Sequence, residues 1–96
     1  MKDAAAQIVG RRISGVVVRR ARPGKSPMGQ LFLVFEDGFY FEFYAPESQI
    51  MAAGGLDEGG LVRALRYTPD SHVVEWAAVR DPDSGEVSVD SYDINL

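Results

Sequence analysis

Hydrophobic and polar positions alternate along several short stretches of the chain, and the most informative of them is residues 31–44, LFLVFEDGFYFEFY. This stretch contains all five phenylalanines and two of the four tyrosines of the protein. The segment Glu36-Asp37-Gly38 interrupts it, which predicts a β-hairpin with strands at about 30–35 and 39–44. Since neighbouring side chains of a strand point to opposite faces, this pattern places apolar surface on both faces of the hairpin.

The length of the turn decides which side chains share a face. A two-residue Asp37-Gly38 turn would give two mixed faces, whereas a three-residue Glu36-Asp37-Gly38 turn, with Gly38 in the left-handed conformation, pairs Phe35 with Phe39 and separates the faces. We predict the three-residue turn. The face without polar groups is then expected to be core and consists of Leu31, Leu33, Phe35, Phe39, Phe41 and Phe43. The other face is expected to be half-buried and consists of Phe32, Val34, Tyr40, Glu42 and Tyr44.

The remaining elements follow from the same kind of pattern. An alanine-rich segment predicts a short helix at 3–9, and Asp57 is expected to be the N-cap of a second helix that runs to about Tyr67. Residues 45–56 are expected to be irregular. Further strands are expected at 12–20, at 72–80 and at 86–92. In the last of these, the two valines are expected to point inward and Glu86, Ser88 and Asp90 outward.

Together these elements predict one domain, residues 1–96, of the α+β class. The expected order is α-β-β-β-α-β-β, with a mainly antiparallel sheet of about five strands and two helices packed on it. The connections between consecutive strands are short, which favours antiparallel neighbours.

Composition narrows the possible functions. The chain has no cysteine, which excludes disulfides and cysteine nucleophiles and fits the cytoplasm. No apolar run approaches the roughly 20 residues that a membrane helix needs, so no membrane association is expected. The net charge of −4 divides unevenly. Residues 1–30 carry seven basic residues and one acid, net +6, whereas residues 31–96 carry three basic residues and thirteen acids, net −10.

Candidate chemistry is sparse, and no cofactor, metal or catalytic residue is predicted. His72 is the only histidine and lacks partners for a zinc site or a catalytic group. The glycine pairs before the second helix lack the spacing and the lysine of a phosphate loop, and two acids between them would repel an anion. The acids of residues 81–85 fit a turn better than a calcium loop.

Three functions remain open. The favoured hypothesis is a small non-enzymatic interaction protein that uses the aromatic hairpin for self-association, as a homodimer, or for binding a protein partner. One alternative is a small-molecule-binding or catalytic domain whose cleft combines Tyr40, Glu42, Tyr44 and His72. Another is single-stranded nucleic-acid binding through the N-terminal arginines, which the acidic net charge makes unlikely.

The expected binding surface is the second face of the hairpin together with one arginine of the first strand. A helix, a second subunit or a ligand could cover it. The candidate residues for contact with a partner or ligand are Phe32, Val34, Tyr40, Glu42, Tyr44 and Arg19.

Overall fold

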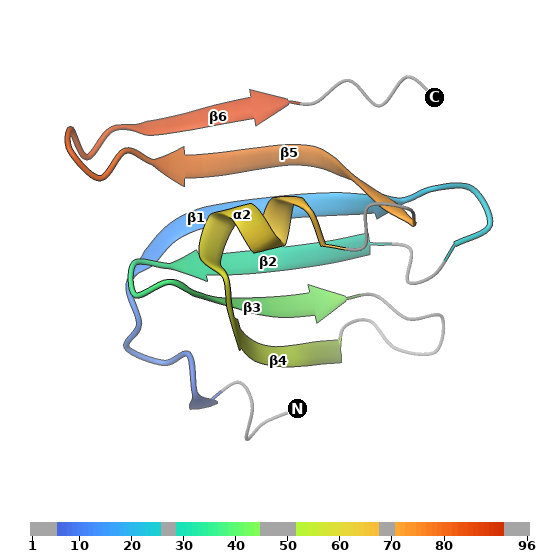
Figure 1. Cartoon of the computed structure of the whole chain (residues 1–96), viewed down its shortest axis with the longest axis horizontal. Helices are drawn as coiled ribbons and strands as arrows, with labels where there is room; N and C mark the ends of the chain where they lie inside the picture. The colour runs from blue at the N-terminus through green and yellow to red at the C-terminus, as the bar shows by residue number, and fades with distance from the viewer. Residues whose placement is uncertain (1–5, 26–28, 45–51, 68–70, 92–96) are drawn as a thin grey trace.

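In the computed structural model, the described residues form an antiparallel sheet of six strands with one short helix on one of its faces (Figure 1). The structure describes residues 6–25, 29–44, 52–67 and 71–91, and for 52–55 and 91 the backbone alone. Its strands are β1 Ile13–Ala21, β2 Gly29–Phe35, β3 Phe39–Tyr44, β4 Ala52–Glu58, β5 His72–Arg80 and β6 Val87–Ser91. Helix α2 spans Gly60–Leu65. The order across the sheet is β4-β3-β2-β1-β5-β6, and every neighbouring pair is antiparallel.

The expectation of an antiparallel sheet with helical cover is confirmed, but the element count and order differ. Residues 52–58, expected to be irregular or to cap a helix, form strand β4 along the edge of β3. Its Ala-Ala-Gly-Gly segment has little β propensity of its own, so the hydrogen-bonding edge of β3 must favour the extended conformation. Of the helix expected at 3–9, the described part shows only Ala6 as helical, followed by a turn at 7–10.

Helix α2 is shorter than expected because glycines set its start. Gly59, and not Asp57, occupies the N-cap, with a left-handed φ of 117°. A Cβ atom at Gly59 would lie 2.6 Å from the Cβ of Arg63, so this turn requires glycine. The Gly59 amide donates to the carbonyl of Gly38 at 3.1 Å, which fixes the start of the helix against the β2–β3 turn.

The predicted hairpin register is confirmed. The Gly38 amide donates to the Phe35 carbonyl at 3.2 Å and Gly38 has a φ of 87°, as a three-residue turn requires. Leu31 is opposite Phe43, and Leu33 is opposite Phe41. The two faces of the hairpin are therefore composed as the sequence indicated.

The assignment of those faces to core and surface is wrong. Helix α2 contacts β1, β2 and β3 on the side that bears Phe32, Val34 and Tyr40, whose exposed fractions are 0%, 3% and 2%. On the face expected to be core, Phe35 and Phe41 are buried, but Leu31, Leu33, Phe39 and Phe43 are only partly buried. The course of the chain through β4 decides which face the helix covers, and the hairpin alone carries no information about that course.

Candidate functional site: the open face of the sheet

The residues predicted to contact a partner lie beneath α2. Arg19, Phe32, Val34, Tyr40 and Glu42 share one face of β1, β2 and β3, and each is at most 8% exposed. Phe32 packs against the rings of Tyr40 and Tyr67, at centroid distances of 5.6 and 5.3 Å. Tyr44, at the end of β3, is partly buried. The structure thus brings these residues together, but as the interior of the protein.

A chain of polar contacts crosses this interior. The Arg19 guanidinium donates to the carbonyl oxygen of His72 at 2.8 Å and to the Gln30 side chain at 3.4 Å. The Gln30 amide donates to the Glu42 carboxylate at 3.0 Å. Neighbouring strands β5, β1, β2 and β3 are thereby joined through side chains, so this network has a clear structural role.

Burial changes the pKa values of several groups in this interior. Burial raises the pKa of Glu42, although the hydrogen bond from Gln30 and the charge of Arg19 act in the opposite direction. Burial also raises the pKa of Tyr40 and of Tyr67. The Tyr40 hydroxyl has no hydrogen-bond partner within the described part of the chain.

His72 does not join Glu42 in a site. His72 begins β5 and Glu42 lies on β3, with β1 and β2 between them. Three strand spacings separate the two positions by about 14 Å or more. The two side chains are therefore beyond hydrogen-bonding distance of one another, and the cleft expected to combine them is not formed by these residues.

The opposite face of the sheet is apolar across its middle, and the charged residues Glu58, Arg20 and Arg80 lie toward its ends. We call it the open face. The registers of neighbouring strands place one row of side chains across all six strands in the order Leu56, Phe41, Leu33, Val16, Ala78 and Val89. A second row, one side chain further along, contains Phe43, Leu31, Val18 and Trp76. Phe39 and Val87 lie at the end nearer the hairpin turn.

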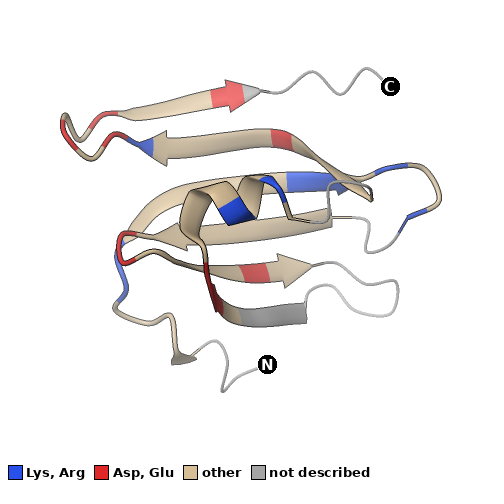
Figure 2. Ribbon diagram, in the orientation of Figure 1, with Lys and Arg blue, Asp and Glu red and all other residues tan. Residues whose placement is uncertain are grey.

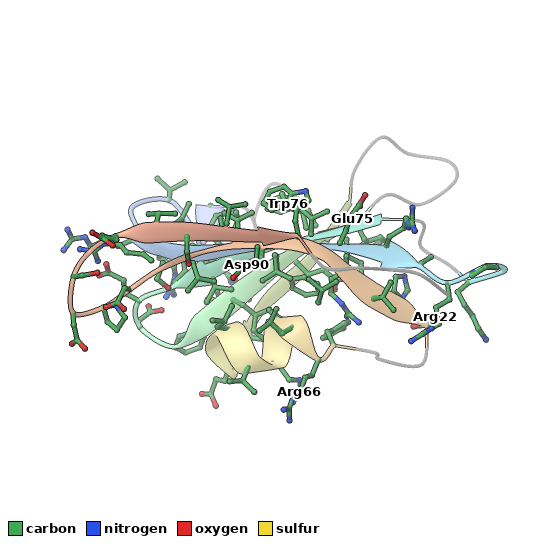
Figure 3. All side chains as sticks on the ribbon, turned by 90° about the horizontal axis from the view of Figure 1, so that it is seen from above. Arg22, Arg66, Glu75, Trp76 and Asp90 are labelled. Atoms are coloured by element: carbon green, nitrogen blue, oxygen red, sulfur yellow. The ribbon has the colours of Figure 1, made fainter. Side chains whose placement is uncertain are left out.

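Several of these side chains are exposed in the single chain. Val87 and Val89 are 64% and 65% exposed, and Trp76 is 37% exposed. Figure 3 shows Trp76 projecting from the face opposite the helix. Val87 and Val89 therefore share the apolar face of β6, as expected, but no described residue covers them.

The edge strands distinguish the two faces. On the helix side, β6 presents Ser88 and Asp90 and β4 presents Asp57, all exposed. On the open face the same strands present the two valines of β6 and Leu56 of β4, together with the exposed Glu58 of β4, which lies opposite Phe39. Both edge strands are thus polar on the helix side, whereas on the open face they are apolar except for Glu58. In antiparallel sheets the apolar face is commonly the one that packs against other groups.

Charged residues border the open face at one end. The Arg11 guanidinium lies over the rings of Phe35 and Phe39, at 5.8 and 5.3 Å from the ring centroids, and forms an ion pair with Asp37. Glu36 pairs with Arg80 at 2.9 Å. Figure 2 shows charged segments of both signs around the turns at this end of the sheet, and further charged positions within β1, β3 and β5. Of the N-terminal arginines, Arg11 and Arg12 are therefore engaged with acids and Arg19 is buried, so these three do not form one basic surface.

A groove lies on the helix side, between α2 and the β5–β6 turn. Its volume is about 460 Å³, and Leu61, Val34, Val79 and Pro82 supply its apolar lining. Its polar lining residues are Ser14, Glu36 and Arg80. The Ser14 hydroxyl donates to the Val34 carbonyl at 3.4 Å and the other two form the ion pair described above, so these groups already have partners. None of the residues of the expected Tyr/Glu/His cleft is among them.

Neither a metal-binding cluster nor a known relative indicates a function. Across residues 6–25, 29–44, 52–67 and 71–91, no cluster of three or more histidine or carboxylate side chains is arranged to hold a metal ion. In the same ranges, no helix has the length and apolar character to cross a membrane. The chain matches no protein-family model, no curated protein and no solved structure.

Proposed function

We propose that this protein is a small non-enzymatic interaction protein that binds a protein partner through its open face. The observation that carries the proposal is the row of six apolar side chains that crosses all six strands, with a second apolar row beside it on β3, β2, β1 and β5. Monomeric proteins seldom expose a contiguous apolar patch of more than a few hundred Å² unless it has a role in binding. The lack of cysteine fits a cytoplasmic setting for this function.

Side chains that gain little free energy of burial in the single chain support this proposal. Complete burial of a valine side chain contributes about 1.5–3 kcal/mol, and Val87 and Val89 are mostly exposed. Trp76 has the largest apolar surface of any residue type and lies in the same region. A partner that covers β5 and β6 would recover this burial, and tryptophan is a frequent anchor residue in protein interfaces.

Binding of an apolar dye tests whether the open face is available. Anilinonaphthalene sulfonate should fluoresce with the wild-type protein at a dilution at which it sediments as a monomer. Val89→Lys should lower that signal several-fold, whereas Ser88→Lys should leave it unchanged, because Ser88 is also exposed but lies on the helix side. A dilute monomer that binds no dye would show that the chain covers this face itself, and the proposal would fail.

A further inference from the structure

We infer that the partner of the open face is a second copy of this chain, packed face to face about a twofold axis parallel to the strands. This inference rests on the proposed function and adds the identity of the partner and the arrangement. The argument comes from the two unequal halves of the open face.

One half of the face is bulky and the other is bare. Strand β3 contributes Phe39, Phe41 and Phe43, of which Phe41 is completely buried against its own chain and packs on Phe43 at a centroid distance of 4.9 Å. The half made by β5 and β6 contributes the small Ala78 and the exposed valines, and a single large side chain, Trp76. Closely packed interiors set large side chains against small ones. Around Ala78 and the valines, the bulky half of one copy therefore complements the bare half of another.

The order of the strands makes this complementarity reciprocal. A twofold axis between β1 and β2 reverses β4-β3-β2-β1-β5-β6, so that β5 of one copy lies over β3 of the other and β6 lies over β4. The registers then set Ala78 at the height of Phe41, which its own chain already covers, and Trp76 over the partly buried Phe43. Val89 meets Leu56 in the same way. An axis across the strands would instead stack phenylalanines on phenylalanines.

The charges at the border fit the same arrangement. The β5–β6 turn carries Asp81, Asp83 and Glu86, all exposed. It lies at the same end of the sheet as Arg11 and Arg12, since Glu36 forms ion pairs with both Arg12 and Arg80, the last residue before this turn. Because an axis parallel to the strands preserves height, the acidic turn of one copy lies next to the basic segment of the other. The Arg12 side chain is 82% exposed in the single chain and is available for such a contact.

The area is sufficient for a stable dimer. The molecule measures 39 × 34 Å in its two longer dimensions and 19 Å in the third. Covering about two thirds of that broad face would bury roughly 900 Å² per copy, against about 800 Å² per partner in a standard interface.

Sedimentation analysis of matched variants tests the identity of the partner. Wild type is expected to be a dimer at micromolar concentration. Val89→Lys should raise the dissociation constant at least tenfold while circular dichroism stays native, because an ammonium group would enter the interface. Ser88→Lys should change it less than about twofold, since rim and outer charges contribute little. A wild-type monomer throughout the micromolar range would overturn the inference, and such a monomer that still binds the dye would leave the proposed function standing.

A distance between spin labels tests the arrangement. The chain has no cysteine, so Ser88→Cys provides a single labelling site per copy on the outer side of β6. With the axis parallel to the strands, the two β6 strands occupy opposite edges of a two-layer assembly. Five strand spacings and one sheet spacing then separate their backbones by about 26 Å. A separation of about 10–15 Å, expected for an axis across the strands, would contradict the arrangement.

Discussion

Replacing Phe32 and Leu33 by alanine, one at a time, tests which face of the sheet is the interior of the single chain. These residues are neighbours on β2 and point to opposite faces. Phe32 is 0% exposed beneath α2, between the rings of Tyr40 and Tyr67. Leu33 lies in the row of the open face and is only partly buried.

The expected magnitudes differ because only one substitution leaves a closed cavity. Phe32→Ala should lower the free energy of unfolding by about 3–5 kcal/mol, the range for a fully buried phenylalanine. For a domain of this size, a loss of about 4 kcal/mol lowers Tm by roughly 16–32 °C. Leu33→Ala should cost only about 1–2 kcal/mol in dilute protein, because part of its side chain already contacts water.

Urea denaturation of the two variants and the wild type, at a dilution at which the protein is monomeric, gives both values. At higher concentration the cost of Leu33→Ala should grow, since this side chain also lies in the proposed interface, whereas the cost of Phe32→Ala should stay constant. Equal costs in dilute protein, or a larger cost for Leu33→Ala, would refute the conclusion that the helix side is the interior.

Two further substitutions test the buried network and the hairpin turn. The pKa of Glu42 lies above its ordinary value of 4.5 mainly through burial, so the folded protein holds this proton more tightly than the unfolded chain. The unfolding free energy of wild type should therefore fall, relative to Glu42→Gln, as pH rises from about 4.5 through the folded pKa, by at most about 1.4 kcal/mol per pH unit. Parallel pH profiles in urea denaturation would contradict this. Gly38→Ala should cost about 1–2 kcal/mol in thermal unfolding, because Gly38 has a φ of 87°. Gly29→Ala is the control and should cost nothing, as a Cβ there meets nothing within 4 Å, and equal effects of the two would rule out the strain argument.

Local patterns predicted local geometry well. The Glu36-Asp37-Gly38 turn and the register from Leu31 opposite Phe43 followed from the need for a glycine at positive φ and from the grouping of side chains by face. The strand at 72–80 was found with its correct bounds for a similar reason, since β-branched residues and a tryptophan fill it.

Features that depend on tertiary contacts were missed. Strand β4 contains Ala-Ala-Gly-Gly and forms along the free edge of β3, which no propensity scale could reveal. The side on which α2 packs depends on the path through β4. Because both faces of the hairpin are rich in apolar side chains, choosing the face without polar groups as the interior gave the wrong face.

One signal for the open face was present in the sequence. The alternation of Val87 and Val89 with Ser88 and Asp90 indicated an apolar side of β6. The same signal was present in the run of Trp76 and Ala78. Only the register between β5 and β6 shows that these side chains lie on one face, and that this face continues into the hairpin phenylalanines.

The single tryptophan provides the most direct test of the central claim, that a second copy covers the open face. Trp76 is 37% exposed in the single chain and lies where β3 of the second copy is expected. Its fluorescence should be measured from nanomolar to high micromolar protein, together with quenching by acrylamide and with the sedimenting mass. We predict that the emission shifts to shorter wavelength and that quenching weakens as the mass doubles, and that Val89→Lys moves this transition to higher concentration. Emission and quenching that stay constant while the mass doubles would place the interface elsewhere, and a constant monomer mass would contradict the dimer itself.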